Sequence, residues 1–93
     1  MEFDWDPAKN ASNSRKHGIT FEEAQFVFED PEKVGWLCSD PGDDEDRFMV
    51  VGRQGWRIVS VVYTMRGDST RLISARKASP RERRAYDQSE TYL

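Results

Sequence analysis

Three arginines and one histidine are the side chains of this sequence best suited to chemistry on a phosphodiester. Arg47, Arg71 and Arg76 can each offer forked N–H donors to phosphate oxygens and stabilise negative charge that develops at phosphorus. His17, the single histidine, can accept and donate a proton near neutral pH. The arginines can equally pair with nearby acids such as Glu45, and His17 can simply be a helix C-terminal cation. Residue types alone leave both interpretations open.

A second set of residues has the composition of a nucleic-acid surface. Arginines gather in and before a predicted C-terminal helix, and aromatic rings on which bases can stack include Trp36 and Tyr63. Arginines along a helix are also typical of a solvated face, and aromatic rings also pack in cores. The candidates for RNA binding are Trp56, Arg57, Arg81, Arg83 and Arg84.

The net charge of −3 hides an asymmetry along the chain. Residues 1–52 carry five basic and thirteen acidic side chains, whereas residues 53–84 carry nine basic and two acidic ones. Such a basic segment indicates that a polyanion or an acidic partner binds there. Mutual neutralisation of the two halves within the fold explains the asymmetry equally well.

The length of 93 residues predicts one domain, residues 1–93, with a small core. Cys38 is the single cysteine, so no intrachain disulfide can form and a cytoplasmic location is expected. The acidic N-terminus has no apolar run typical of a signal peptide or a membrane span. No His, Cys, Asp and Glu spacing is typical of a metal site, and no glycine motif is typical of a nucleotide cofactor. We therefore expect no metal, no cofactor and no membrane partner.

Capping signals predict two helices near the N-terminus. Asp6-Pro7 suits an N-cap followed by the first helical position, and Gly18 suits the left-handed residue that ends a helix. Thr20 should open a second helix, with Glu23 completing a capping box. That helix should end at Asp30-Pro31.

Apolar and β-branched runs predict the strands. They are expected at Val34–Cys38, Arg47–Gly52, Trp56–Met65 and Thr70–Ala75, with a short edge strand at Phe3–Trp5. Hairpin-length connections indicate an antiparallel meander of three to four strands. Ser79, Pro80 and Glu82 predict a capped helix from Pro80 to about Ser89. The expected class is α+β, with two N-terminal helices, the meander and a C-terminal helix.

Strand parity predicts which side chains share a face of this sheet. The assumed pairs are Gly52 with Gly55 or Arg53 with Trp56, then Met65 with Thr70 and Val62 with Ile73. Arg47 and Arg71 then share a face two strands apart, ~10 Å between backbones, and Glu45 joins them if its strand extends that far. Arg76 reaches that face only if a bulge or bend precedes it. The opposite face is the expected core face and carries Phe48, Val50, Val59, Val61, Tyr63 and Leu72.

Seven short motifs, in order along residues 3–86, resemble the BrnT-type toxins of type II toxin–antitoxin modules. The motifs are Phe3-x-Trp-Asp6, Lys9…Asn13-x-x-Lys-His-Gly18, Phe21-Glu-Glu-Ala24, Phe28-x-Asp-Pro31, Glu45-x-Arg47, Arg71-x-Ile-Ser-Ala-Arg76 and Glu82-Arg83-x-x-Tyr86. Each motif is weak alone, whereas the ordered set is specific.

The resemblance implies a RelE-like fold and a ribonuclease that cleaves RNA and inhibits translation. It also implies a BrnA-type protein antitoxin with a ribbon-helix-helix DNA-binding domain, so that promoter DNA is contacted only through the antitoxin. Carried over by position, the implied catalytic set is Lys16, His17, Glu45, Arg47, Arg71 and Arg76.

Metal-independent RNA cleavage suits these residue types. The 2′-hydroxyl of RNA can attack its own phosphate when a base, an acid and cationic stabilisation are supplied. In this hypothesis the arginines stabilise the transition state, His17 and Glu45 transfer protons, and Lys16 orients the phosphate. The alternative is a non-catalytic module that binds nucleic acid or docks a partner.

Overall fold

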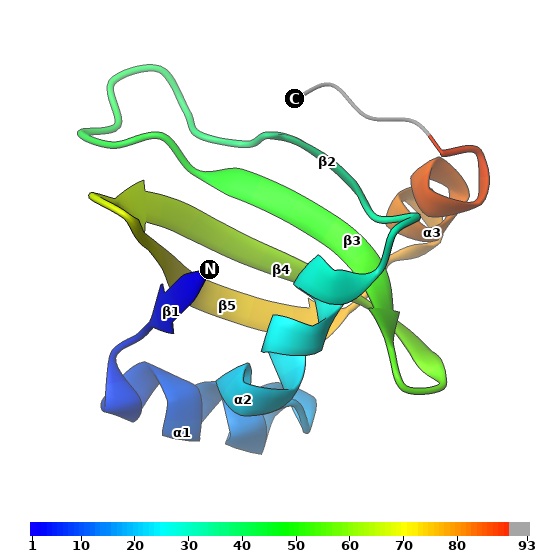
Figure 1. The fold of residues 1–93 in the computed structure, drawn as a ribbon, viewed down its shortest axis with the longest axis horizontal. Coiled ribbons are helices and arrows are strands. Elements are labelled where there is room, and N and C mark those ends of the chain that lie inside the picture. Colours follow the sequence, from blue (N-terminus) through cyan, green and yellow to red (C-terminus); the bar gives the residue numbers. More distant parts are fainter. Residues whose placement is uncertain (90–93) are drawn as a thin grey trace.

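The computed structural model describes residues 1–89, which fold into a five-stranded sheet with helices packed against it (Figure 1). Residues 90–93 of the expected domain lie outside this described part. The elements are β1 (Glu2–Asp4), α1 (Pro7–His17), α2 (Phe21–Ala24), the 3₁₀ helix η1 (Gln25–Glu29), β2 (Val34–Leu37), β3 (Phe48–Gln54), β4 (Arg57–Arg66), β5 (Ser69–Lys77) and α3 (Pro80–Asp87). The predicted α+β class is confirmed. No helix in residues 1–89 is long and apolar enough to cross a membrane.

Strands β2 to β5 form the predicted antiparallel meander, and β1 adds a parallel strand at its edge. The strand order is β1-β5-β4-β3-β2, with Glu2 opposite Ser69 and Asp4 opposite Arg71. Partners so distant in sequence leave no local pattern, which is why the sequence indicated an edge strand but not its partner.

The predicted helix caps are confirmed. The Asp6 side chain accepts a hydrogen bond from the Ala8 amide at 2.9 Å, and Gly18 ends α1 with a φ of 68°. Thr20 and Glu23 form the capping box of α2. The expected continuous second helix tightens after Ala24 into η1, which has three residues per turn.

Asn13 ties α1 to the edge of β5 beyond the short β1. Its side-chain amide donates to the carbonyls of Ala75 at 2.7 Å and Ile19 at 2.9 Å, and its oxygen accepts from the Ala75 amide at 3.0 Å. The side chain thus satisfies backbone groups of β5 that no strand reaches. This buried contact fixes α1 beside β5.

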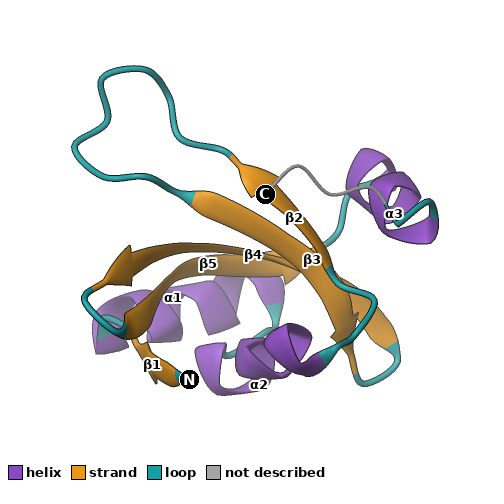
Figure 2. Cartoon of the chain, turned by 45° about the horizontal axis from the view of Figure 1, so that its top comes forward, coloured by secondary structure: helices purple, strands orange, loops and turns teal. Residues whose placement is uncertain are grey.

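Two apolar clusters lie on opposite faces of the sheet. The larger cluster joins the predicted core face to α2 and η1, and the smaller one lies under α3 (Figure 2). Phe21 and Val27 are fully buried in the larger cluster, while Tyr86 anchors α3 in the smaller one. In the described part of the chain, the second face of the sheet carries no helix apart from α3 at one end (Figure 2). We call this second face the open face.

Two of the assumed strand pairings are wrong. Gln54 pairs with Arg57, Arg53 with Ile58 and Gly52 with Val59, so the turn of the first hairpin lies one or two residues further along the chain than either assumed pairing placed it. Val62 pairs with Ser74 instead of Ile73, because a β-bulge interrupts β5 between the partners of Val62 and Tyr63. The first error leaves side-chain parity unchanged, whereas the bulge moves every later residue of β5 to the other face.

Candidate nucleic-acid interface on the open face

Arg47 and Arg71 lie in one row across the open face. Arg71 stands opposite Thr64, and continuing the register of Phe48 with Tyr63 by one residue places Arg47 opposite Thr64 as well. The two arginines therefore flank β4, ~10 Å apart between backbones. The extrapolated register agrees with the predicted sharing of a face by Arg47 and Arg71.

Among the described residues, the guanidinium of Arg71 has one carboxylate partner, Asp4. Its Nη1 lies 3.2 Å from Asp4 Oδ1, and the two side chains are 29% and 44% exposed. A pair this exposed contributes only about 0–1 kcal/mol to stability. An incoming phosphate can therefore replace Asp4 at little cost.

Arg76 also faces the open side, because the bulge reverses its parity and sets it opposite Ser60. The sequence analysis required a bulge or bend before Arg76 for it to reach this face, and the bulge in β5 meets that condition. Its guanidinium makes two hydrogen bonds of 2.7 Å to the two carboxylate oxygens of Glu82. Glu82 Oε1 also accepts from the Ser60 hydroxyl at 2.8 Å and from the Ser79 amide at 2.9 Å. Arg76 is consequently held in a fixed orientation.

The environment of Glu82 keeps its carboxylate ionised. Burial raises the pKa of this carboxyl, but the hydrogen bonds from Arg76, Ser79 and Ser60 outweigh burial and lower the pKa to about 2. A carboxylate with so low a pKa is a poor proton acceptor near neutral pH. Glu82 therefore acts as the anchor of Arg76 and as the cap of α3.

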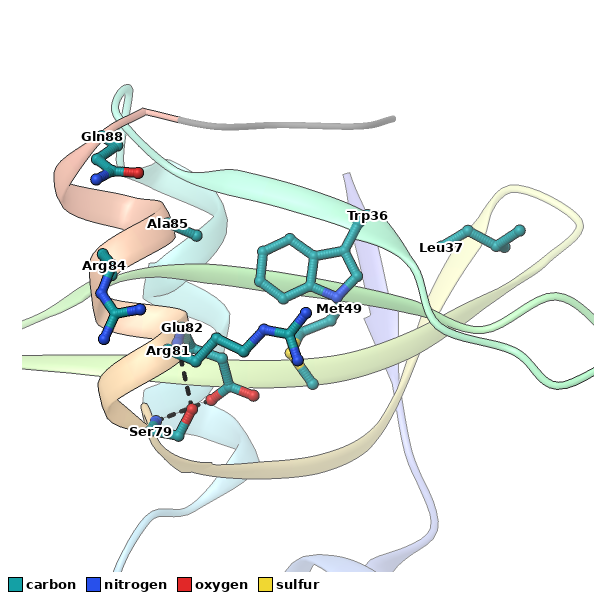
Figure 3. A pocket seen from close by; sticks show the side chains of 9 residues that line it. All are labelled: Trp36, Leu37, Met49, Ser79, Arg81, Glu82, Arg84, Ala85 and Gln88. Carbon is teal, nitrogen blue, oxygen red and sulfur yellow. Dashed lines mark hydrogen bonds between the residues drawn. The ribbon is translucent and has the colours of Figure 1, made fainter.

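A groove runs between α3 and the strands β2 and β3 (Figure 3). Its volume is about 780 Å³. The Trp36 indole extends from β2 towards α3, and Arg81 reaches from α3 towards Met49 (Figure 3). The lining residues are Trp36, Leu37, Met49, Ser79, Arg81, Glu82, Arg84, Ala85 and Gln88.

Lys16 and His17 form the exposed C-terminal end of α1. The Gly18 carbonyl, one residue further, accepts from Arg57 Nη1 at 3.4 Å. The end of α1 therefore lies beside the first residue of β4.

This position separates His17 from Arg71. Arg71 stands opposite Thr64, seven residues along β4 from Arg57, which corresponds to roughly 23 Å. Arg76 stands opposite Ser60, only three residues along the same strand. The structure thus brings Lys16 and His17 towards the Arg76 end of the sheet and leaves Arg71 at the other end.

The remaining predicted residues are dispersed. Glu45 precedes β3 and pairs with Arg66 at 3.6 Å, at the Arg71 end. The guanidinium of Arg57 donates a hydrogen bond to Gln54 at 2.7 Å and lies 3.6 Å from the Glu23 carboxylate. Partners within the protein therefore already bind this candidate RNA-binding side chain.

Four candidates for RNA binding are exposed on the surface: Trp56, Arg81, Arg83 and Arg84. Trp56 is 86% exposed in the β3–β4 turn. Arg83 is exposed on α3 but does not line the groove, unlike Arg81 and Arg84. Within residues 1–89, no group of three or more His, Cys, Asp or Glu is placed to hold a metal ion.

Sequence reasoning missed that Glu82 holds Arg76. The capping box explained Glu82 by itself, so no further partner was sought. A usable signal existed, because only Ala78 and Ser79 separate β5 from α3. Because this connection is so short, the first turn of α3 must lie close to the last residues of β5. Trp36 was recognised as a ring on which a base can stack, but its place in a groove beside α3 was not predicted.

Comparison with known protein families gives a match that covers most of the chain. Residues 5–82 match a family described as ribonuclease toxin, BrnT, of type II toxin-antitoxin system. No curated protein matches the chain.

Proposed function

The chain belongs to the BrnT family of ribonuclease toxins of type II toxin–antitoxin systems, and on this premise we propose that it cleaves single-stranded RNA, without a metal, across the open face of its sheet. Membership of this family implies an RNA substrate and an antitoxin partner. The observation that supports the location is the register, which sets Arg71 and Arg76 on one face and, continued by one residue beyond Phe48, favours the same face for Arg47.

Arg47 and Arg71 hold the scissile phosphate in this proposal. Their backbones flank β4, and two extended guanidinium groups can close a gap of ~10 Å around one phosphate. The exposed ion pair of Arg71 with Asp4 gives way to the substrate. Arg76, kept in place by Glu82, contacts the RNA further along β5.

Cleavage proceeds by attack within the RNA. The 2′-oxygen loses its proton and bonds to the adjacent phosphorus, while the bond from phosphorus to the 5′-oxygen breaks and that oxygen takes up a proton. The products are a 2′,3′-cyclic phosphate and a 5′-hydroxyl end. Negative charge grows on the phosphate oxygens in the transition state, where the arginines stabilise it.

Glu45 is the proton acceptor that best fits a reaction at the Arg71 end, because its loop leads directly into β3 beside Arg47. Lys16 and His17 then contact the RNA at the Arg76 end. If His17 is instead the proton carrier, the scissile phosphate lies at the Arg76 end. Comparing Glu45→Gln with His17→Gln in the cleavage assay separates these two placements.

The antitoxin is proposed to be of the BrnA type, with a ribbon-helix-helix domain that binds promoter DNA. Translation stops in the absence of this antitoxin because RNA is cleaved. Both statements rest on family membership.

Substituting Arg71 with alanine tests the proposed site. We expect Arg71→Ala to lower the cleavage rate of an RNA oligonucleotide, assayed in EDTA, by roughly 10²-fold or more, the scale for removing a group that stabilises developing charge. Arg15→Ala, an exposed arginine of α1, is the matched control and should keep the wild-type rate. Induced expression of the same proteins should abolish growth for wild type and Arg15→Ala but not for Arg71→Ala.

Two results would contradict the proposal in different ways. An unchanged rate for Arg71→Ala removes this arginine from the reaction. Wild-type protein that binds the oligonucleotide and leaves it intact supports the alternative of a non-catalytic binding module.

A further inference from the structure

From the groove beside Arg76 we infer a subsite for one unpaired nucleotide of the RNA, in which Trp36 stacks on the base and Arg81 and Arg84 contact the flanking phosphates. This inference rests on the proposed function, because it extends the RNA path from the open face of the sheet. It adds a recognition site, next to the reaction, that can select the sequence or structure to be cleaved.

The charges of the groove suit an anion. Arg81 and Arg84 lie on its α3 side, and neither has an ion-pair partner among the described residues. Glu82 is the one carboxylate among the lining residues, and its oxygens are occupied by Arg76, Ser60 and Ser79. The groove therefore offers two free positive charges against no free negative one.

The opposite side of the groove is apolar and aromatic. Trp36 and Met49 are only partly buried, although they pack against the cluster under α3. The indole of Trp36 extends across the groove, with Arg81 nearby (Figure 3). Stacking on an aromatic ring needs a base that is not paired in a duplex, which indicates single-stranded RNA.

The groove is continuous with the open face. Glu82 lines the groove and at the same time holds Arg76 through two hydrogen bonds of 2.7 Å. An RNA strand whose phosphate lies at Arg76 therefore reaches the groove with its neighbouring nucleotide. A volume of about 780 Å³ falls within the range of small-ligand sites and leaves room for a base with its sugar and phosphate.

A single-stranded RNA fits these features better than a protein segment does. A partner peptide with acidic side chains would satisfy the arginines but gives no reason for a partly exposed indole beside them. The combination of a ring surface with two arginines is typical of single-stranded nucleic-acid sites. Protein docking is therefore kept as one outcome of the test below.

Binding of a 2′-O-methyl RNA hexanucleotide tests the subsite, because this probe lacks the attacking hydroxyl and cannot be cleaved. Its Kd is measured by fluorescence anisotropy over a range of salt concentrations. Trp36→Leu should weaken binding roughly 10-fold at constant salt dependence, since it removes stacking and no charge. Arg81→Ala and Arg84→Ala should each lower the slope of log K against log salt by ~0.7, the effect of one phosphate contact on a single strand.

Arg15→Ala serves as the control, because Arg15 is exposed on α1, lies outside the groove and has no ion pair within residues 1–89. It should retain the wild-type affinity and slope. Arg81 and Arg84 are exposed on α3, so their alanine variants should fold even if Trp36→Leu does not. Trp36→Phe should restore most of the binding lost in Trp36→Leu, because phenylalanine keeps a stacking ring.

The outcomes separate this inference from the proposed function. If the groove variants keep wild-type affinity while Arg71→Ala loses cleavage, the subsite is disproved and the ribonuclease site stands. If the groove variants lose probe binding but wild-type protein cleaves no RNA, the subsite stands and the proposed reaction fails. If the variants lose affinity for the antitoxin and not for the probe, the groove is a protein-docking surface and the inference is overturned.

Discussion

Arginines of residues 53–84 divide into three groups according to their partners, and the first is Arg76 alone, which pairs with Glu82 of the same segment. Arg57, Arg66 and Arg71 pair with Glu23, Glu45 and Asp4 of the acidic half of the chain. Arg53, Arg81, Arg83 and Arg84 have no ion pair among the described residues. Both interpretations of the charge asymmetry therefore hold in part, since some charges neutralise each other and others are left to attract an anion.

The partly buried ion pair of Glu82 with Arg76 makes stability depend on pH. The pKa of Glu82 falls from 4.5 to about 2 on folding, so its contribution is complete above pH ~4.5 and is lost as pH falls towards 2. A shift of this size corresponds to up to about 3 kcal/mol. We expect the free energy of unfolding of wild type, measured with urea, to fall over this range, and that of Glu82→Gln to be lower at pH 7 but to fall less.

Glu29→Gln is the control for this pH dependence, because Glu29 is an exposed carboxylate at the end of η1. Its unfolding curve should follow that of wild type at each pH. Equal pH dependence of wild type and Glu82→Gln would show that the carboxylate gains nothing from Arg76.

At the scale of elements, the starts of the helices were predictable from the sequence, because contacts between residues close in sequence determine them. Asp6, Thr20 and Ser79 cap their helices with their own side chains, so each helix start was readable from a few residues. The bulge in β5 was not readable, because it depends on how β5 lies against β4 and α1. This single irregularity decides whether Arg76 belongs to the open face, so the candidate site was only partly predictable.

The edge of β5 shows how one side chain can replace a missing strand. Asn13→Ala should lower the free energy of unfolding by about 2–4 kcal/mol, because it leaves the buried N–H and C=O of Ala75 without their partner. Urea unfolding measures the loss, and faster amide exchange at Ala75 should accompany it. Ser12→Ala, on the same helix and with no side-chain hydrogen bond within residues 1–89, should change stability by less than about 0.5 kcal/mol. A similar loss in both variants would contradict a specific role for the Asn13 amide.

At the scale of the molecule, the packing of α3 determines whether the open face has its groove. Asp30, which follows η1, accepts hydrogen bonds from the Arg53 amide at 2.8 Å and from the Tyr86 hydroxyl at 2.7 Å. Burial raises the pKa of Asp30, but these bonds outweigh it and lower the pKa. The carboxylate thus joins η1, β3 and α3. The sequence marked Asp30 only as a helix end, since partners 23 and 56 residues away leave no local signal.

Close packing supports the same junction. A Cβ atom on Gly52 would lie 3.0 Å from Val27 Cγ1 and 3.3 Å from Asp30 Oδ2. Glycine at this position of β3 therefore lets η1 approach the strand closely. The contact places Asp30 within reach of Tyr86 on α3.

Removing the Tyr86 hydroxyl should loosen α3 while leaving its ring in the core. We expect Tyr86→Phe to lower the free energy of unfolding by about 1.5–3 kcal/mol, the contribution of a hydrogen bond to a charged acceptor. Tyr63→Phe removes a hydroxyl that makes no hydrogen bond within residues 1–89, so it should stay within about 0.5 kcal/mol of wild type. Urea unfolding of both variants gives the difference. Because α3 carries Arg81 and Arg84, Tyr86→Phe should also weaken binding of the RNA probe. Equal stability of Tyr86→Phe and Tyr63→Phe would show that the Asp30 contact does not hold α3 in place.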